Sequence, residues 1–237
     1  MNTVMHSANQ RGFADHGWLK TFHSFSFASY FDPNKMGFGS LRVLNDDTVQ
    51  GGMGFGSHSH DNMEIISIPI KGSLAHKDNQ GHEQVIHDSE VQIMSAGTGI
   101  IHSEYNASKT EEVNFLQIWI LPNKKDIQPR YAQKIFPVTD REEKWQILVS
   151  PEVDNDSLWI NQRATISRIL LPKSKSIEYK TKFENSGIYL FLIEGDIKIG
   201  DFQLGRRDGL GISGTKHLQI DSSSKSDLLV IEVPMTA

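Results

Sequence analysis

Short β-forming runs separated by turn residues are the feature that most constrains this chain. Runs rich in Ile, Val, Leu and Phe alternate with Gly, Asn, Asp and Ser, and no long stretch has the 3.6-residue period of an amphipathic helix. Many short strands at close spacing are typical of a sandwich or a barrel, whereas parallel βαβ units would need helices. The strands predicted in this way are residues 40–44, 63–69, 85–86, 91–94, 113–121, 165–171, 187–193, 196–199 and 227–233.

A polar segment divides the chain into two parts. Residues 123–145 contain proline, lack strand alternation and have room for a helical turn, so we expect a linker there between domains 1–122 and 146–237. The two parts resemble each other, because residues 64–78 and 187–201 both have a β-rich run, a glycine turn, a second strand and a terminal Asp. We therefore expect an all-β protein made of two similar barrels.

Composition excludes several classes of protein. The chain has no cysteine, so it has no disulfide, iron–sulfur cluster, Cys-based zinc site or cysteine nucleophile. A formal charge of −5 without a dense basic run argues against a surface that binds nucleic acid directly. The apolar runs are too short to span a bilayer, and the N-terminus has no apolar signal-peptide core. We therefore expect a cytoplasmic protein that does not bind membranes.

Two pairs of residues that contain histidine have the i, i+2 spacing that places side chains on the same face of a strand. Residues i and i+2 of a strand face the same way, so His58 converges with His60, and His102 with Glu104. Either pair alone is explained equally well by surface histidines. Two such pairs on neighbouring strands of one barrel would surround a point with three imidazoles and a carboxylate. The combination favours a metal centre, and its nitrogen and oxygen donors suit Fe, Mn, Ni, Cu or Zn.

The remaining motifs are interpreted as structural. Residues 51–56, with four glycines, fit neither the dinucleotide nor the P-loop pattern, and a serine triad would need a Gly-x-Ser-x-Gly elbow that this sequence lacks. His76, His82 and His87 lie around a polar hairpin, where we expect solvent exposure, with one of them within reach of the site. His217 is alone in the second half, where a surface or structural role is expected.

The residues around the two pairs resemble the motifs of a known barrel, the cupin. The two motifs are Gly52-x5-His58-x-His60-x3-Glu64 and Gly97-x-Gly99-x2-His102-x3-Asn106. More narrowly, the chain resembles the pirin family in His23-Ser-Phe-Ser-Phe-Ala, Asp32-Pro, Phe55-x-x-His58-x-His60, Met94-Ser-Ala-Gly-Thr-Gly-Ile-Ile-His102-Ser-Glu104 and Leu116-Gln-Ile-Trp119. The resemblance covers residues 20–122. It implies two tandem cupin barrels (double-stranded β-helix, jelly roll), with one metal ion in the first and a metal-free second barrel.

The resemblance also implies a ligand set. One divalent transition metal ion is held by His58, His60, His102 and Glu104, with Fe(II) the expected ion and Mn, Ni, Cu or Zn as alternatives. Glu64, a ligand in many other cupins, is retained as an alternative ligand or as a hydrogen-bond partner of the ligands.

One residue beside the second histidine departs from the family pattern. Asp61 stands where pirin-like proteins generally have Arg. The lost positive charge puts recognition of an anionic substrate or partner in doubt more than it does metal binding.

The activity implied by the resemblance is that of a quercetin 2,3-dioxygenase. Such an enzyme cleaves a flavonol with dioxygen and releases carbon monoxide, and Glu104 is the candidate catalytic base for the 3-hydroxyl proton. The main alternative is a non-enzymatic, metal-bound, redox-responsive protein that regulates a protein partner. A third interpretation is a sugar or keto-acid isomerase of the cupin type. We expect a monomer, because two barrels in one chain can pack as paired subunits would.

Overall fold

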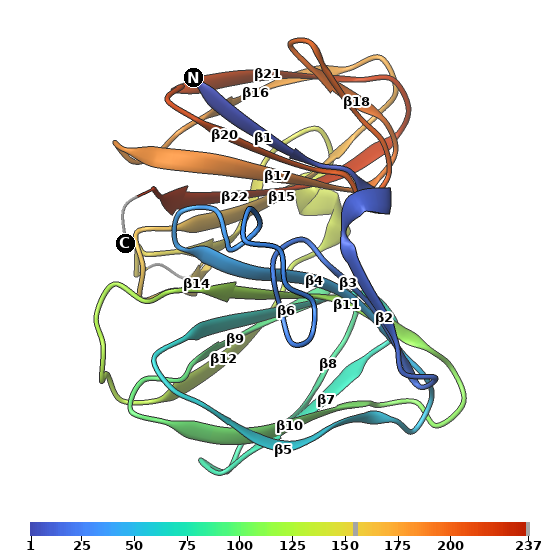
Figure 1. Ribbon diagram of the computed structural model, residues 1–237, viewed down its shortest axis with the longest axis vertical. Coiled ribbons are helices and arrows are strands. Elements are labelled where there is room, and N and C mark those ends of the chain that lie inside the picture. The colour runs from blue at the N-terminus through green and yellow to red at the C-terminus, as the bar shows by residue number, and fades with distance from the viewer. Residues whose placement is uncertain (154–155, 236–237) are drawn as a thin grey trace.

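The chain forms four stacked β-sheets, two in each half (Figure 1). The computed structural model describes residues 1–153 and 156–235. In each half a seven-stranded sheet faces a four-stranded sheet, which confirms the prediction of an all-β protein with two barrels. The helical segments within the described ranges are two short 3-10 helices, η1 (Ala8–Gln10) and η2 (Val138–Arg141). No helix there is long and apolar enough to cross a membrane.

The N-terminal barrel is antiparallel throughout. Its seven-stranded sheet has the order β12-β9-β6-β11-β4-β3-β2, and its four-stranded sheet the order β5-β10-β7-β8. The strands of the larger sheet are β2 (Gly12–Asp15), β3 (Leu19–His23), β4 (Leu41–Val49), β6 (Glu64–Lys71), β9 (Glu90–Ser95), β11 (Val113–Ile120) and β12 (Arg130–Ile135). Those of the smaller sheet are β5 (Gly54–His60), β7 (Leu74–Asp78), β8 (Glu83–Ile86) and β10 (Ile100–Asn106).

The C-terminal barrel repeats this arrangement. Its sheets have the orders β1-β20-β17-β22-β15-β13-β14 and β16-β21-β18-β19. The strands of the larger sheet are β1 (Asn2–His6), β13 (Gln146–Ser150), β14 (Leu158–Trp159), β15 (Thr165–Leu171), β17 (Ser186–Glu194), β20 (Gly209–Ser213) and β22 (Ser226–Pro234). Those of the smaller sheet are β16 (Ser176–Lys180), β18 (Ile197–Ile199), β19 (Phe202–Leu204) and β21 (His217–Ser222). In the two orders β6 corresponds to β17, β11 to β22 and β10 to β21.

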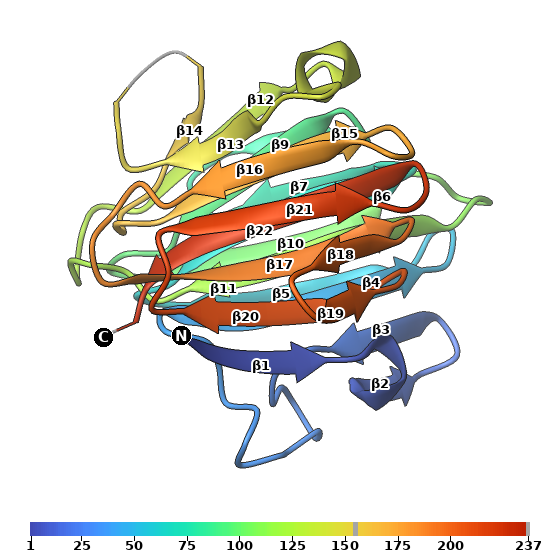
Figure 2. The ribbon, with the colours of Figure 1, turned by 90° about the horizontal axis from the view of Figure 1, so that it is seen from above.

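Two segments pair in ways that the sequence pattern did not indicate. The expected linker, residues 123–145, contains β12, which is the edge strand next to β9, and it also contains η2. The first strand of the chain, β1, pairs with β20 of the second half (Figure 2). The division into domains 1–122 and 146–237 stays a prediction.

The two seven-stranded sheets pack face to face in the middle of the molecule. A single cluster of buried residues joins Leu44 and Ile118 of the first half to Ile166, Tyr189 and Ile231 of the second. Apolar faces of two sheets are buried most fully when they pack on each other. The barrels are thus held back to back, and each smaller sheet is on the outside.

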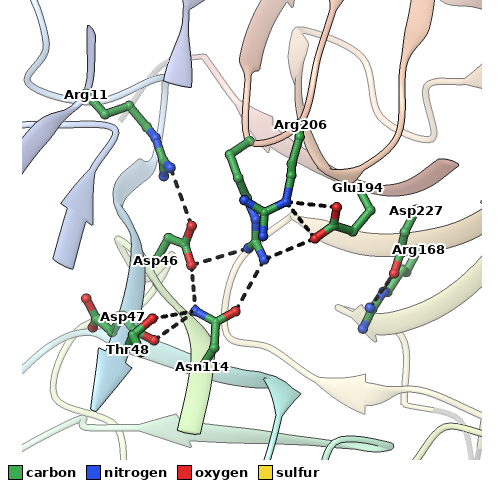
Figure 3. Close-up of polar contacts among 10 residues, drawn as sticks. Arg11, Asp46, Asp47, Thr48, Asn114, Arg168, Glu194, Arg206 and Asp227 are labelled. Carbon is green, nitrogen blue, oxygen red and sulfur yellow. Dashed lines mark hydrogen bonds and ion pairs between the residues drawn. The ribbon is translucent and has the colours of Figure 1, made fainter. Parts of the chain in front are cut away.

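A buried polar cluster accompanies this apolar contact (Figure 3). Asp46 on β4 accepts hydrogen bonds from Arg11 Nη2 at 3.4 Å, from Arg207 Nη1 at 3.3 Å and from Asn114 Nδ2 at 2.8 Å. The side chains of Arg11, Asp46 and Arg207 are all less than 10% exposed. Arg11 comes from the N-terminal segment, Asp46 from the first barrel and Arg207 from the second. Separating any of these parts would leave a buried charge without its partner, so the cluster favours a single arrangement of the three.

Candidate metal centre

Three histidine side chains meet on the smaller sheet of the N-terminal barrel. His58 and His102 lie directly opposite each other on the paired strands β5 and β10, and His60 follows His58 on the same face. The ring centroids are 4.8 Å apart for His58 and His60, 4.4 Å for His58 and His102, and 5.0 Å for His60 and His102. One donor nitrogen of each ring lies within 4.8 Å of the other two.

The hydrogen bonds leave donor nitrogens free for a cation. The Nδ1–H of His58 donates to the Gly56 carbonyl oxygen at 2.8 Å, so its Nε2 keeps a lone pair. His102 is buried, and its Nε2 has no hydrogen-bond partner among the described residues. An unpaired buried nitrogen is unfavourable unless something binds it. The residues therefore fit a divalent transition metal ion.

The environment keeps two of these imidazoles neutral. Burial, together with a smaller contribution from the neighbouring histidines, lowers the pKa of His60 to about 4 and that of His102 to about 3. A neutral imidazole has the lone pair that a metal needs. At neutral pH these two rings can thus bind a metal ion without first releasing a proton.

Glu104 is held in place from two sides. It is buried, and its Oε1 accepts a hydrogen bond from Ser67 Oγ at 3.0 Å, while its Oε2 accepts one from Gln117 Nε2 at 2.7 Å. The amide oxygen of Gln117 in turn accepts a hydrogen bond from Trp119 Nε1 at 3.2 Å. Glu104, His102 and His76 form a second group of donor atoms within 4.8 Å. His102 belongs to both groups and so connects Glu104 to His58 and His60.

A cavity of about 370 Å³ opens beside these residues, lined in part by His58, His60 and Glu104. Phe27, Phe55 and Trp119 contribute aromatic walls, and the ring of Trp119 lies edge-to-face at 4.9 Å from His60 and at 5.3 Å from Phe27. A cleft that is largely apolar with a few polar groups is the usual form of a small-molecule site.

Asp47 is a pocket residue that sequence analysis missed. Its side chain lines the cavity from β4, and its Oδ1 has no hydrogen-bond partner in the part of the chain that the structure describes. Burial raises the pKa of Asp47 to about 7, although Thr21 donates a hydrogen bond to it. Asn45 also lines the cavity, and the i, i+2 spacing of Asn45 and Asp47 on a buried strand was the available signal.

The prediction of solvent exposure was wrong for His76. His76 is 1% exposed, because β7 runs between β10 and β8 and turns Leu74, His76 and Asp78 into the barrel. His87 is exposed and His82 is partly so. The same period of two that identified the candidate ligand pairs also applies to Leu74, His76 and Asp78, and it could have identified His76.

The other acidic residues singled out in the sequence belong to neither group of candidate ligands among the described residues. Glu64 is buried, and its Oε2 accepts hydrogen bonds from Ser95 Oγ at 2.8 Å and from the Asn161 amide at 3.2 Å. Burial raises the pKa of Glu64, and it belongs to neither group of candidate ligands among the described residues. Asp61 is exposed at the end of β5. In the second half His217 is exposed and contacts Glu178 at 2.9 Å.

Two family models match this chain. The model described as Pirin matches residues 4–120, and the model described as Quercetinase C-terminal cupin domain matches residues 147–233. A protein from Escherichia coli strain K12 named quercetin 2,3-dioxygenase is 40% identical over 97% of this chain and 98% of its own length. A pirin-like protein from Caulobacter vibrioides is 39% identical over 93% and 95%, respectively.

The fold has solved counterparts. The crystal structure of the bacterial pirin YhhW from Escherichia coli in complex with nickel(II) matches with a TM-score of 0.93 and 38% identity, covering 98% of this chain and 99% of that one. A second crystal structure of YhhW has a TM-score of 0.94. The two barrels are thus cupin barrels, and a nickel complex is known for a similar chain.

Proposed function

Because this chain belongs to the pirin family, we propose that it is a metal-dependent dioxygenase that opens a flavonol such as quercetin by 2,3-dioxygenation, with release of carbon monoxide. The observation that carries this proposal is the convergence of three imidazoles, one of them with an unpaired buried nitrogen, beside a cavity with aromatic walls. Relatives with the name quercetin 2,3-dioxygenase add support.

His58, His60, His102 and Glu104 are the proposed ligands. The three imidazoles supply neutral nitrogen donors and Glu104 supplies the negative charge. When bound, a divalent ion acts as a Lewis acid toward an anionic substrate oxygen. Fe(II) is the ion that we propose, and the nickel complex of YhhW keeps Ni(II) as the first alternative.

The pocket residues suit a flat phenolic substrate. The rings of Phe27, Phe55 and Trp119 can pack against an aromatic ligand, while Asn45 and Asp47 offer polar atoms to its hydroxyl groups. Aromatic walls also exclude water, which strengthens the electrostatic interactions inside the cavity.

Glu104 has two proposed roles, as ligand and as acceptor of the substrate's 3-hydroxyl proton. The hydrogen bonds from Ser67 and Gln117 fix its orientation, and each carboxylate oxygen keeps further acceptor capacity. If Glu104 accepts the proton, Glu104→Gln retains more metal than activity. Equal loss of metal and activity would mean that Glu104 acts as a ligand alone.

The decisive test is aerobic turnover of quercetin by protein loaded separately with iron, manganese, nickel, copper or zinc. We expect loss of quercetin absorbance together with release of carbon monoxide in at least one metal form. The metal-free protein is the control. Absence of turnover in all five forms would overturn the dioxygenase proposal and favour the non-enzymatic, redox-responsive regulator, which needs the ion but no substrate.

A further inference from the structure

A buried His–Asp pair lies behind His102. His76 and Asp78 alternate on β7, and both side chains are fully buried. His76 Nε2 is 3.1 Å from Asp78 Oδ2, and His76 Nδ1 is 3.5 Å from His102 Nδ1. The three side chains form a row that runs from the candidate metal centre into the wall of the barrel.

Asp78 is fixed as the acceptor at the end of this row. Its Oδ1 accepts hydrogen bonds from the backbone amides of Gln80 at 2.9 Å and His82 at 3.0 Å. Its Oδ2 lies 2.8 Å from His82 Nδ1. The ring of Tyr131 packs against His76 and His82, with centroid distances of 4.8 and 4.9 Å. The position of His76 is therefore determined from both sides.

These contacts determine which ring nitrogens carry protons. Since a carboxylate only accepts, His76 Nε2 must donate to Asp78, and the Nδ1 of a neutral His76 is left as an acceptor. The Nδ1–H of His102 can then donate to it. This leaves the lone pair of His102 on Nε2, which is the buried nitrogen without a partner among the described residues.

We propose that His76, anchored by Asp78, is a positioning residue that holds His102 with its Nε2 lone pair toward the metal centre. This inference rests on the metal site of the proposed function and adds to it two residues that do not bind the ion. Groups that bond the outer nitrogen of a ligating histidine fix its tautomer and its ring orientation.

The second barrel offers an internal comparison. Counted from the corresponding turns at Gly72 and Gly195, His76 corresponds to Ile199, which is part of a buried apolar cluster. By the same count Asp78 corresponds to Asp201, which is exposed, so the second barrel keeps the aspartate but lacks the buried His–Asp pair. A residue needed only for barrel packing would not have to be histidine.

The test compares His76→Phe, His76→Gln and Asp78→Asn with the wild-type protein, and His217→Gln serves as the exposed control. Metal affinity is measured by competition with a coloured chelator. Proton NMR of the Co(II)-loaded protein in H₂O and D₂O detects the exchangeable N–H groups of the ligating imidazoles. The Tm of each metal-free variant shows whether the fold is retained.

We expect His76→Phe and Asp78→Asn to bind metal about 10–100-fold more weakly, the usual cost of losing such a partner. The N–H signal of His102 should exchange faster or disappear in both. His76→Gln should recover part of the affinity, because the amide oxygen can accept the His102 proton. His217→Gln should match the wild type. If His76→Phe does not fold, the other two variants carry the test.

Unchanged affinity and unchanged N–H signals in His76→Phe and Asp78→Asn would overturn the proposal. So would the loss of one coordinated imidazole from the Co(II) spectra of His76→Phe and His76→Gln alike, since His76 would then be a ligand. Neither measurement uses a flavonol or dioxygen. A protein that binds metal in this way but does not turn over quercetin would contradict the proposed function alone.

Discussion

The two barrels share one fold and differ in what fills them. The interior of the C-terminal barrel is closed by one apolar cluster of fifteen buried residues, among them Leu190, Ile199, Leu218 and Ile220. In the N-terminal barrel the corresponding space holds the clustered histidines, Glu104 and the cavity, and only small apolar clusters lie around them. The centre of one barrel is thus filled with apolar side chains, whereas that of the other holds polar groups beside a cavity.

The difference holds position by position. The turns at Gly72 and Gly195 align Leu74 with Ile197. Leu74 pairs with Asn106 on β10, and Ile197 pairs with Ser222 on β21, so Asn106 corresponds to Ser222. Two and four residues before these partners, Glu104 and His102 correspond to Ile220 and Leu218. In the same alignment Ser67 and Gln117, which hydrogen-bond Glu104, correspond to Leu190 and Val230. In the C-terminal barrel, apolar side chains thus stand in place of two proposed ligands and of the residues that hydrogen-bond Glu104.

The polar residues of the N-terminal barrel, which are the clustered histidines, Glu104 and their hydrogen-bond partners, are stable in the interior only as a complete set. Burying a charged or polar group without its partners costs several kcal/mol, so a barrel gains by keeping either the whole set or none of it.

The largest effect is expected for His102→Leu, which gives β10 the residue found at the matching position of β21. We expect a loss of metal affinity greater than the about 10–100-fold that supporting residues cost. The metal-free variant should be less stable than the wild type, because the buried His76 Nδ1 loses its partner while the rest of the polar set stays. Equilibrium dialysis with metal analysis, combined with thermal unfolding, measures both quantities. Wild-type affinity in this variant would contradict the comparison.

Ile220, the residue of the C-terminal barrel that corresponds to Glu104, should matter only for packing. Ile220→Ala leaves a cavity in the apolar cluster and should lower the free energy of unfolding by about 2–5 kcal/mol. Metal affinity should not change. Urea unfolding and chelator competition test the two statements, and a change in metal affinity as large as that of a ligand variant would show that the barrels are not independent.

Metal binding should stabilise the N-terminal barrel of the wild-type protein. A free metal concentration one hundred times the Kd adds about 2.7 kcal/mol to the free energy of unfolding. For a chain of this size that corresponds to a rise in Tm of about 5–10 °C. Scanning calorimetry with and without metal measures the rise. His102→Leu is the control, and an equal rise in this variant would mean that the ion binds elsewhere.

The smallest effect is expected for Asp47, whose counterpart in the alignment is the fully buried Ile169. Burial raises the pKa of Asp47 from its ordinary value of 3.8 to about 7 in the folded protein. The folded state therefore loses stability as the pH rises from about 4 to about 7, and the loss is constant above that.

We therefore expect the metal-free Asp47→Asn variant to match the wild type in Tm near pH 4 and to exceed it at pH 8. The gain should be modest, because the introduced amide is also buried. Thermal unfolding across this pH range checks the prediction, and a gain at pH 4 as large as that at pH 8 would exclude the ionisation of Asp47 as its cause.

The strands that sequence could predict are those with a strong local signal. The runs of β6, β11, β15, β17 and β22 are rich in Ile, Val and Leu, and each was predicted. The convergence expected for His58, His60 and His102 follows from the period of two, and the structure brings these three residues together.

The features that sequence could not predict depend on contacts between distant segments. β12 is a polar edge strand, and its pairing with β9 is not visible in its own pattern. The position of His76 depends on β7 being an inner strand, and the raised pKa of Asp47 depends on burial by neighbouring strands. Local periodicity shows which residues share a face, but only the assembled sheets show which face is enclosed.

The position of β1 has a consequence for the order of assembly. Its ladder partner β20 lies near the other end of the chain, and beside it the Ala8 amide donates to Asp208 Oδ1 across 200 positions. A contact of such high sequence separation forms late, because loop-closure entropy must be overcome first. On the ribosome, this edge of the second sheet stays open until nearly all of the chain has been synthesised. Strand β1 is thus synthesised well before β20 and can complete its pairing only after β20 is available.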